Sequence, residues 1–375
     1  MFRSLSRLGA ILLLILGAVD AQAQTAPAPL TLEGDFVIHD FKFRSGELLP
    51  DLRLHYTTLG QPQRDRHGDV TNAVLILHGT GGDGHQFLRP QFAGVLFAPG
   101  GLLDPAKYFI ILPDGIGHGK SSKPSDGLHA DFPHYDYDDM VAATYALVTM
   151  GLKVKHLRLV MGTSMGCMHS FVMGETYPDF MDGLLPLACL PVQIAGRNRI
   201  WRRMAMDAIT NDPAWNGGDY ATQPLAGLRT ASDLLVLAGS APLLMQKNFP
   251  TRETADAYLD ETIAKDLASL DANDFLYQLD ASRNYDASLL LDKISAHLIW
   301  VNSADDFINP PELGIAEKQI TQIKNGRFVL IPISEQTHGH GTHTWAALWQ
   351  QYLAQLLAES EPPPPPPKKP RRRGR

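Results

Sequence analysis

Residues 157–171 of this chain read LRLVMGTSMGCMHSF. The apolar first half is typical of a buried parallel strand, because helices cover both faces of such a strand. The pattern Gly-x-Ser-x-Gly follows at Gly162, Ser164 and Gly166, before a helix-length segment that ends at Pro178. A strand, a tight turn and a helix in this order predict that the turn exposes the Ser164 hydroxyl, with glycines on both sides because larger side chains would collide there.

The pattern around Ser164 is not sufficient evidence by itself. Three fixed positions in five also arise by chance in a chain with 32 glycines. A serine nucleophile needs a general base, an acid that orients the base, and N–H groups that stabilise an oxyanion. The rest of the sequence has to supply these groups.

The first 23 residues have the features of a signal peptide. Arg3 and Arg7 precede an apolar run over residues 8–19, which is too short to span a bilayer, and residues 21–23 (Ala-Gln-Ala) form a small-x-small cleavage site. An uncleaved membrane anchor is the alternative. We expect cleavage before Gln24 and a soluble, exported product, periplasmic or secreted, with no transmembrane segment after cleavage.

The charge of the chain is distributed unevenly. The whole chain carries −7, the tail from Lys368 carries six basic residues and the signal segment nets +1, which leaves −14 on residues 24–361. An acidic body argues against nucleic-acid binding. Roughly 340 residues remain after cleavage, enough for one large α/β domain with an insertion, or for two domains.

Apolar and alternating runs indicate an α/β organisation. Strands are predicted at residues 34–43, 51–58, 73–77, 108–112, 157–162, 184–190, 296–301 and 327–333, and helices at residues 136–150, 199–209, 254–270 and 344–358. The first two strands are expected to be antiparallel, with a turn at residues 45–46. Helices between the later apolar strands predict a mostly parallel, twisted sheet. Residues 191–294 show no clear buried strand and are predicted to form an inserted helical lid, which would exclude water and shape the substrate pocket.

A glycine-rich loop, HGTGG at residues 78–82, follows the strand at residues 73–77. A loop at this place can bring a backbone N–H to a nucleophile. We therefore take the N–H groups of Thr80 and Met165 as candidate oxyanion donors, the alternative being an ordinary strand-to-helix loop. His118 precedes Ser164 in the chain, and chain order favours a loop-ordering role for it over that of a catalytic base.

The last two strands end in candidate acid and base residues. Asp305 and Asp306 follow the strand at residues 296–301, and His338, His340 and His343 follow the final strand. The order Ser, Asp, His is that of the α/β-hydrolases. A metal site is the other interpretation of three neighbouring histidines, but the glycines between them give no rigid ligand geometry and no carboxylate cluster accompanies them. We expect neither a metal nor a cofactor.

Cys167 and Cys189 are the two cysteines of the chain. An exported protein could join them, but one falls in a predicted helix and the other at the end of a predicted strand, so we expect two buried free thiols. The segment after residue 361 is a run of prolines and then a basic cluster, typical of a disordered tail. It could contact an anionic surface or merely aid solubility.

Several motifs together resemble the homoserine O-acetyltransferase-like branch of the α/β-hydrolases over most of the mature chain. The similar segments are GTSMGCM at residues 162–168, DPAWNGGDY at 212–220, DANDFLY at 271–277, DFINPPE at 306–312 and Gly-His at 339–340. The resemblance implies an α/β-hydrolase fold with a helical lid. It also implies a triad of Ser164, Asp306 and His340, favouring Asp306 over Asp305 and His340 over the other two histidines.

The expected organisation is a signal peptide (1–23), the first part of the hydrolase core (24–190), the lid (191–294), the second part of the core (295–360) and a Pro-rich basic tail (361–375). Transferases of this branch commonly have Asp after the Gly-His, where this chain has Gly341. They also carry Arg two positions before Ala-Ile in the lid, where this chain has Met206. The sequence alone leaves open whether Arg202 or Arg203 takes that place.

These departures and the predicted export weaken the expectation of a homoserine transferase, because a site without both partners would bind homoserine poorly and acetyl-CoA is a cytoplasmic donor. The expected function is an exported serine esterase that cleaves a small carboxylic ester through an acyl-enzyme. An acyltransferase with the same intermediate is one alternative, and a non-catalytic binding protein on the same fold is another. The resemblance makes a homodimer possible, because these transferases pair through their lids.

Overall fold

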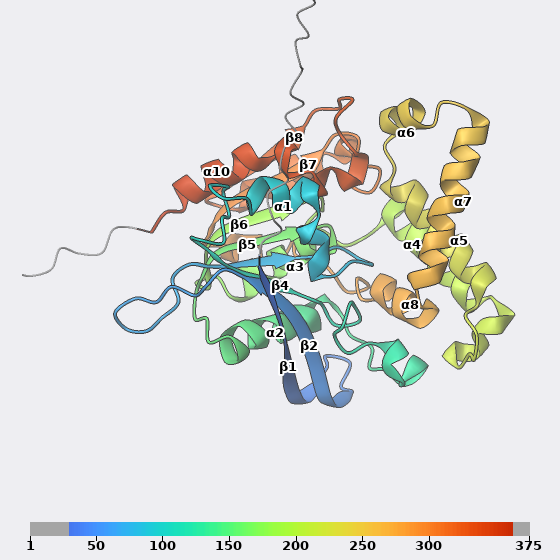
Figure 1. The fold of residues 1–375 in the computed structure, drawn as a ribbon, viewed down its shortest axis with the longest axis horizontal. Coiled ribbons are helices and arrows are strands. Elements are labelled where there is room, and N and C mark those ends of the chain that lie inside the picture. Colours follow the sequence, from blue (N-terminus) through green and yellow to red (C-terminus); the bar gives the residue numbers. More distant parts are fainter. Residues whose placement is uncertain (1–29, 363–375) are drawn as a thin grey trace, which may run out of the picture.

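The computed structural model describes residues 30–362, which are built around one eight-stranded sheet (Figure 1). Its strands are β1 Thr31–Lys42, β2 Leu48–Leu59, β3 Ala73–Leu77, β4 Phe109–Pro113, β5 Leu157–Thr163, β6 Met181–Leu187, β7 His297–Ser303 and β8 Gly326–Ile331. Their order across the sheet is β1-β2-β4-β3-β5-β6-β7-β8. β2 is antiparallel to β1 and to β4, and all other neighbours are parallel. The predicted α/β fold with a mostly parallel sheet is confirmed.

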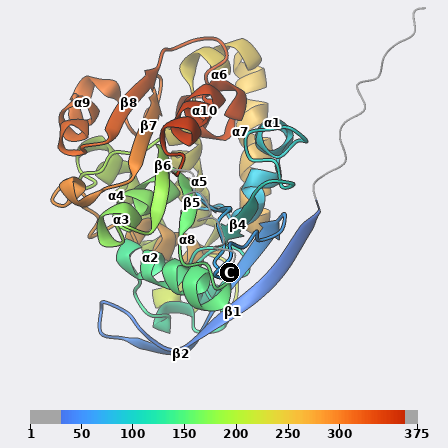
Figure 2. The ribbon, with the colours of Figure 1, turned by 90° about the vertical axis from the view of Figure 1, so that its left-hand side faces the viewer.

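Helices cover both faces of the sheet, as Figure 2 shows for the strands β5 to β8. One face is covered by α1 Pro90–Leu96 and α10 Gln350–Glu359, and the other by α2 Tyr137–Ala146, α3 Met165–Thr176 and α9 Ile315–Gln319. Successive side chains of a strand point to opposite faces. In β3, Val74 and Ile76 therefore pack with α1 and α10, whereas Leu75 and Leu77 pack with α2 and α3. Burial of all five β3 residues explains the continuous apolar run in the sequence.

Five helices lie between β6 and β7 in the chain, in the region predicted to be a lid. They are α4 Gly196–Thr210, α5 Leu225–Gly239, α6 Pro242–Asn248, α7 Arg252–Ser269 and α8 Ala272–Asp280, and we call residues 196–280 the helical insertion. It lies beside the sheet, at the right of Figure 1. The insertion has its own apolar core, which includes Trp201, Ile209, Leu228 and Phe275.

Some element boundaries differ from those predicted. β6 ends at Leu187 and not at residue 190, and the last helix begins at Gln350 and not at residue 344, because residues 339–348 form two 3₁₀ turns. The helix predicted over residues 136–150 is α2 followed by a π-helical turn to Gly151. α2 begins where predicted, because Asp136 and Asp139 form a reciprocal capping box.

Within residues 30–362, no single helix has the length and apolar composition needed to cross a membrane. α5 and α6 meet those criteria only when taken together, and they are bent by 104° at the break between them. The predicted signal peptide (1–23) lies outside the described residues, as does the predicted tail beyond residue 362.

Cys167 and Cys189 form a disulfide with their Cα atoms 5.8 Å apart, so the expectation of two free thiols is wrong. The register of the sheet explains the bridge. β5 and β6 are parallel neighbours, with Thr163 opposite Leu187. Cys167 lies in the first turn of α3 after β5, and Cys189 lies two residues beyond the end of β6. Both cysteines therefore emerge at the same edge of the sheet.

Replacement of both cysteines by alanine (C167A/C189A) is expected to lower the free energy of unfolding by about 3 kcal/mol, because a bridge over a loop of this size restricts the unfolded chain. Urea unfolding followed by circular dichroism measures the change. As a control, a reductant should lower the unfolding midpoint of the wild type and leave that of the double variant unchanged. Equal midpoints for the oxidised wild type and the variant would contradict the prediction.

Candidate active site

Ser164 lies on the turn between β5 and α3, with φ 54° and ψ −111°. Residues other than glycine rarely adopt this conformation. The turn is tight: a Cβ on Gly162 would lie 1.9 Å from the carbonyl oxygen of Gly166, and a Cβ on Gly166 would lie 2.1 Å from the carbonyl oxygen of Leu77. Backbone approaches this close exclude every side chain at both positions. The Gly-x-Ser-x-Gly pattern is thus a steric requirement of the strained turn.

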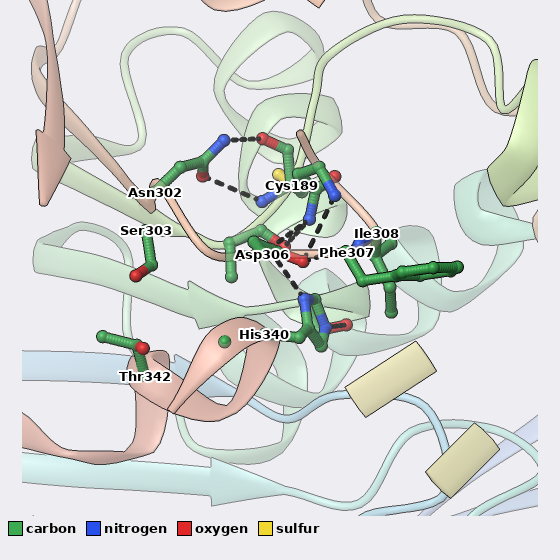
Figure 3. A network of polar contacts seen from close by, with 12 residues as sticks. Cys189, Asn302, Ser303, Asp306, Phe307, Ile308, His340 and Thr342 are labelled. Atoms are coloured by element: carbon green, nitrogen blue, oxygen red, sulfur yellow. Dashed lines mark hydrogen bonds and ion pairs between the residues drawn. The ribbon is translucent and has the colours of Figure 1, made fainter. Parts of the chain in front are cut away.

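Ser164, His340 and Asp306 form a hydrogen-bonded chain. The distance from Ser164 Oγ to His340 Nε2 is 2.8 Å, and that from His340 Nδ1 to Asp306 Oδ2 is 2.9 Å. Figure 3 shows the His340 ring directed at the Asp306 carboxylate. Because the carboxylate accepts a hydrogen bond from Nδ1–H, Nε2 is free to accept the serine proton. The structure therefore brings together the three residues that the sequence predicted as a triad.

Asp306 is fixed within a set of buried donors. One carboxylate oxygen accepts hydrogen bonds from the N–H groups of Ile308 and Asn309 (2.8 and 3.2 Å), and the other accepts one from the Asn309 side chain (2.9 Å). Burial alone would raise the pKa of Asp306, but the charge of His340 and these hydrogen bonds hold the pKa below its ordinary value. Asp306 therefore stays ionised and fixes the orientation of the imidazole.

Asp305, the other acid left open by the residue pattern, has a different set of contacts. Its Oδ2 accepts hydrogen bonds from the Thr337 hydroxyl (2.8 Å) and from the Gly339 N–H (3.1 Å). These contacts hold the loop that carries His340. The two adjacent carboxylates thus have different roles: Asp306 orients the imidazole of His340, and Asp305 holds the loop that carries His340.

The other histidines lie apart from the Ser164 hydroxyl. His338 stacks on Trp345 with ring centroids 4.0 Å apart, and His343 is buried with its ring edge-on to His340. Burial lowers the pKa of His343 to about 3, so it stays neutral at physiological pH. His118 is buried and bonded to the Ile116 carbonyl in its own loop (2.9 Å). In the part of the chain that the structure describes, no cluster of His, Cys, Asp and Glu is arranged to hold a metal ion.

The glycine-rich loop after β3 lies against the nucleophile turn. The Gly166 N–H donates to the His78 carbonyl (2.9 Å), and a Cβ on Gly79 would lie 3.2 Å from the Ser164 Cβ. Met165 is the first residue of α3, so its N–H has no acceptor within the helix. The segments that carry the two predicted oxyanion donors, Thr80 and Met165, therefore flank Ser164.

A cavity of about 530 Å³ opens beside Ser164 and His340. Its wall is mostly apolar and comes from α3, the segment after β6, the start of α4 and the segment from the end of β7 to the start of α9. The apolar residues are Met168, Ala188, Leu190, Val192, Ile194, Ile308, Leu313 and Ile315. Cys189 also lines the cavity, so the disulfide ties this wall to α3. In Figure 3 the Cys189 backbone is held by the Asn302 side chain, whose amide donates to the Cys189 carbonyl (3.0 Å). The cavity is large enough for a small organic ester.

The structure distinguishes between the two arginines that the sequence left open. Arg202 is buried and lines the cavity, whereas Arg203 is exposed and pairs with Asp207 on the outer face of α4 (2.6 Å). Met206, at the position where transferases of the branch carry arginine, is buried in the core of the insertion. Arg202 therefore supplies a cation to the cavity from one helical turn earlier.

A sequence model of the alpha/beta hydrolase fold family matches residues 72–355, which contain the strained turn, the triad and the cavity. The chain belongs to this family. A probable acyltransferase of Methanothermobacter thermautotrophicus is 31% identical over 283 residues, covering 74% of this chain and 84% of its own length. Homoserine O-acetyltransferase of Thermobifida fusca is 27% identical over 304 residues, covering 71% and 78%. These likenesses place this α/β-hydrolase in the homoserine O-acetyltransferase-like branch, as its motifs indicated.

Among solved structures, the acetyl esterase MekB is similar, with a TM-score of 0.75, 24% sequence identity, and coverage of 87% of this chain and 97% of its own. The similarity shows a shared fold. The same fold is thus shared by proteins named for acyl transfer and by one named for ester hydrolysis. A shared fold does not show whether water or another molecule accepts the acyl group.

Some residues of the site were not found from the sequence. Asn309 orients Asp306 and donates its second amide hydrogen bond to the Ala188 carbonyl (3.0 Å), which joins the loop after β7 to the end of β6. The sequence does show an asparagine three residues after Asp306, which could have indicated this role. Asparagine is common in loops, however, and its partner at residue 188 is distant in sequence. The contact becomes visible only when β6 and β7 are placed side by side.

The steric account of the turn predicts opposite outcomes for two glycines. Gly166→Ala should lower the free energy of unfolding by about 3 kcal/mol or more, or prevent folding, because its Cβ would overlap backbone atoms. Gly341→Ala is the matched control, since its Cβ would meet only the His338 Cβ at 3.7 Å. Urea unfolding of both variants measures the difference. A Gly166→Ala variant as stable as the wild type would refute the steric explanation.

Proposed function

We propose that this α/β-hydrolase is an exported serine esterase that cleaves small carboxylic esters through an acyl-enzyme intermediate. The hydrogen-bonded chain from Ser164 Oγ through His340 to Asp306 is the observation that carries the proposal. A serine hydroxyl becomes nucleophilic when an oriented imidazole can take its proton. The cavity beside Ser164 gives the substrate a place to bind.

In the proposed reaction, Ser164 Oγ attacks the ester carbonyl carbon while His340 Nε2 takes the hydroxyl proton. The carbonyl oxygen becomes an oxyanion, which the N–H groups of Thr80 and Met165 stabilise. Asp306 stabilises the imidazolium by accepting the hydrogen bond from Nδ1. Collapse of the tetrahedral intermediate breaks the ester C–O bond, and the alcohol leaves with the proton from His340. The acyl group is then bound to Ser164.

A water molecule completes the cycle. His340 takes a proton from the water as the water oxygen attacks the acyl carbon. It then returns the proton to Ser164 as the carboxylic acid leaves.

Removal of one oxyanion donor from such a site typically lowers turnover by about 10²–10³-fold. The turn that holds Ser164 keeps these donors in place before the substrate arrives, which is why the strained conformation serves catalysis.

Export is part of the proposal, and two observations support it. The sequence begins with the features of a signal peptide, and Cys167 and Cys189 form a disulfide. Disulfides persist in the periplasm and outside the cell and are rare in the cytoplasm. Export also argues against acyl transfer from coenzyme A, because this thioester donor would have to be supplied outside the cytoplasm.

The roles assigned to the two neighbouring acids can be separated by hydrolysis of 4-nitrophenyl acetate. Asp306→Asn should lower kcat by about 10⁴-fold, because the imidazole loses its oriented tautomer. Asp305→Asn should lower kcat by at most about tenfold, because it weakens only the support of the loop.

Ser164→Ala should abolish both hydrolysis and labelling by a fluorophosphonate, and its circular dichroism spectrum should remain that of the folded wild type. Labelling that persists in the Ser164→Ala variant would mean another nucleophile.

Acyl transfer to an alcohol or amine is the second candidate, favoured by the names of the two sequence relatives. It proceeds through the same acyl-enzyme. The two reactions differ only in the molecule that takes the acyl group from Ser164, which is water in hydrolysis and an alcohol or amine in transfer. Adding homoserine or simple alcohols to the reaction with 4-nitrophenyl acetate and analysing the products separates the two. The esterase proposal expects acetate as the main product at every acceptor concentration. An acetylated acceptor that replaces most of the acetate would establish the transferase instead.

A further inference from the structure

The cavity beside Ser164 is much larger than the acyl group of an acetate ester. Its volume is about 530 Å³, which lies within the range of about 300–1,000 Å³ for pockets that enclose drug-sized ligands. An acetyl group has only a few non-hydrogen atoms. An acetate of a short alcohol would therefore leave most of the cavity to water.

The wall next to the triad is buried and apolar. Met168 follows Ser164 by one turn of α3, Ile308 follows Asp306 by two residues, and Ala188 follows the end of β6. All three side chains line the cavity and are at most 9% exposed. An alkyl group that displaces water from such a wall gains affinity, by up to about fourfold for each methylene.

The polar groups of the wall come mainly from other places. Arg197 and Glu312 line the cavity but are exposed to solvent at its mouth. Arg202 is buried and reaches the cavity from α4, where its Nε donates to a neighbouring side chain (3.0 Å). The amide of Asn309 is taken up by Asp306 and by a backbone carbonyl. The wall formed by α3 and by the segments after β6 and β7 thus offers a substrate mostly apolar contacts.

The apolar wall is held in shape before a substrate binds. Cys189 is joined to α3 by the disulfide, and its N–H and carbonyl both bond to the Asn302 side chain (3.2 and 3.0 Å), as Figure 3 shows. The same carbonyl accepts a hydrogen bond from Trp300 Nε1 (3.0 Å), and the Leu190 carbonyl accepts one from the Tyr285 hydroxyl (3.2 Å). A wall fixed in this way does not close around a small acyl group, so the cavity favours a group that fills it.

We propose that the cavity binds an apolar chain of the substrate, so that the preferred substrate is an ester with a medium-length alkyl group in its acyl or its alcohol part, and not an acetate of a short alcohol. This inference rests on the proposed esterase function and narrows its substrate. Ser164 and His340 line the same cavity, so the alkyl group enters it while the ester carbonyl lies beside Ser164. A chain that extends to the mouth also covers Leu313, which is 57% exposed there.

Two series of esters test the proposal. The acyl series is 4-nitrophenyl acetate, butanoate, hexanoate and octanoate, and the alcohol series is ethyl, butyl, hexyl and octyl acetate. Each kcat/KM is divided by the rate constant for hydroxide-catalysed hydrolysis of the same ester. In at least one series this quotient should rise by about 10–100-fold from the shortest ester to the hexanoate or hexyl ester, because the added methylenes leave water. The series that rises tells which part of the ester occupies the cavity. A flat or falling quotient in both series would overturn the proposal.

Variants place the chain at the apolar wall. The chain-length ratio is the quotient for the hexanoate or hexyl ester over that for the shortest ester, in the series that rises. Val192 lines the cavity and is partly exposed, so a larger side chain there fills the cavity without overpacking the core. Val192→Trp should lower the chain-length ratio by about tenfold or more, and Val192→Thr, which keeps the shape and adds a hydroxyl, by about two- to fourfold.

Leu289→Trp is the matched control, because Leu289 is 79% exposed and lies outside the cavity wall. It should keep the wild-type chain-length ratio. A wild-type ratio in both Val192 variants, with wild-type circular dichroism spectra, would place the chain outside this cavity and refute the proposal.

A binding experiment separates this proposal from the esterase proposal. By isothermal titration calorimetry, the Ser164→Ala variant should bind methyl hexanoate about tenfold or more tightly than methyl acetate, and Ser164→Ala/Val192→Trp should lose most of this difference. This outcome would support the apolar site even if the wild type hydrolysed none of the esters. Equal binding of both esters by the Ser164→Ala variant would refute the apolar site while leaving ester hydrolysis to be judged by its own assay.

Discussion

The close approach of three backbone segments at the turn after β5 is the constraint on which the rest of the site depends. Gly166 packs against the Leu77 carbonyl of β3, and Gly162 packs against Gly166 itself. These contacts force Ser164 into a positive φ and present its hydroxyl above the sheet. The same contacts bring the loop after β3 beside the serine. A single steric arrangement thus positions both the nucleophile and the backbone groups around it.

The remaining parts of the triad reach Ser164 through the topology of the sheet. Because β5, β6, β7 and β8 are parallel neighbours, the loops after these strands meet at one edge. The loop after β7 supplies Asp306 and the loop after β8 supplies His340. Neighbouring loops also stabilise each other: Asn309 bonds to the end of β6, and Asp305 bonds to the loop that carries His340. Residues separated by 176 positions therefore come within hydrogen-bond distance.

The helical insertion and the segment after β6 give the site its individual character. Helix α4 carries Arg202 to the cavity, and the disulfide ties the segment after β6 to α3, next to the nucleophile. The triad defines a class of chemistry that many proteins on this fold share. Which molecule reacts depends on the cavity wall. In this chain the wall is mostly apolar, and its polar groups include the buried guanidinium of Arg202.

The sequence by itself determined those features that depend on local chemistry. Buried strands appear as apolar runs, the turn at Ser164 requires glycines at fixed spacing, and the order of nucleophile, acid and base follows from the order of the strands. The choice of Asp306 over Asp305 came from resemblance, because both acids fit the local pattern. Contacts between distant segments required the tertiary structure. The disulfide depends on the register that sets Thr163 opposite Leu187, and the choice of Arg202 over Arg203 depends on which side of α4 faces the cavity. A linear pattern records the type and spacing of residues, whereas register and packing determine which of them meet in space.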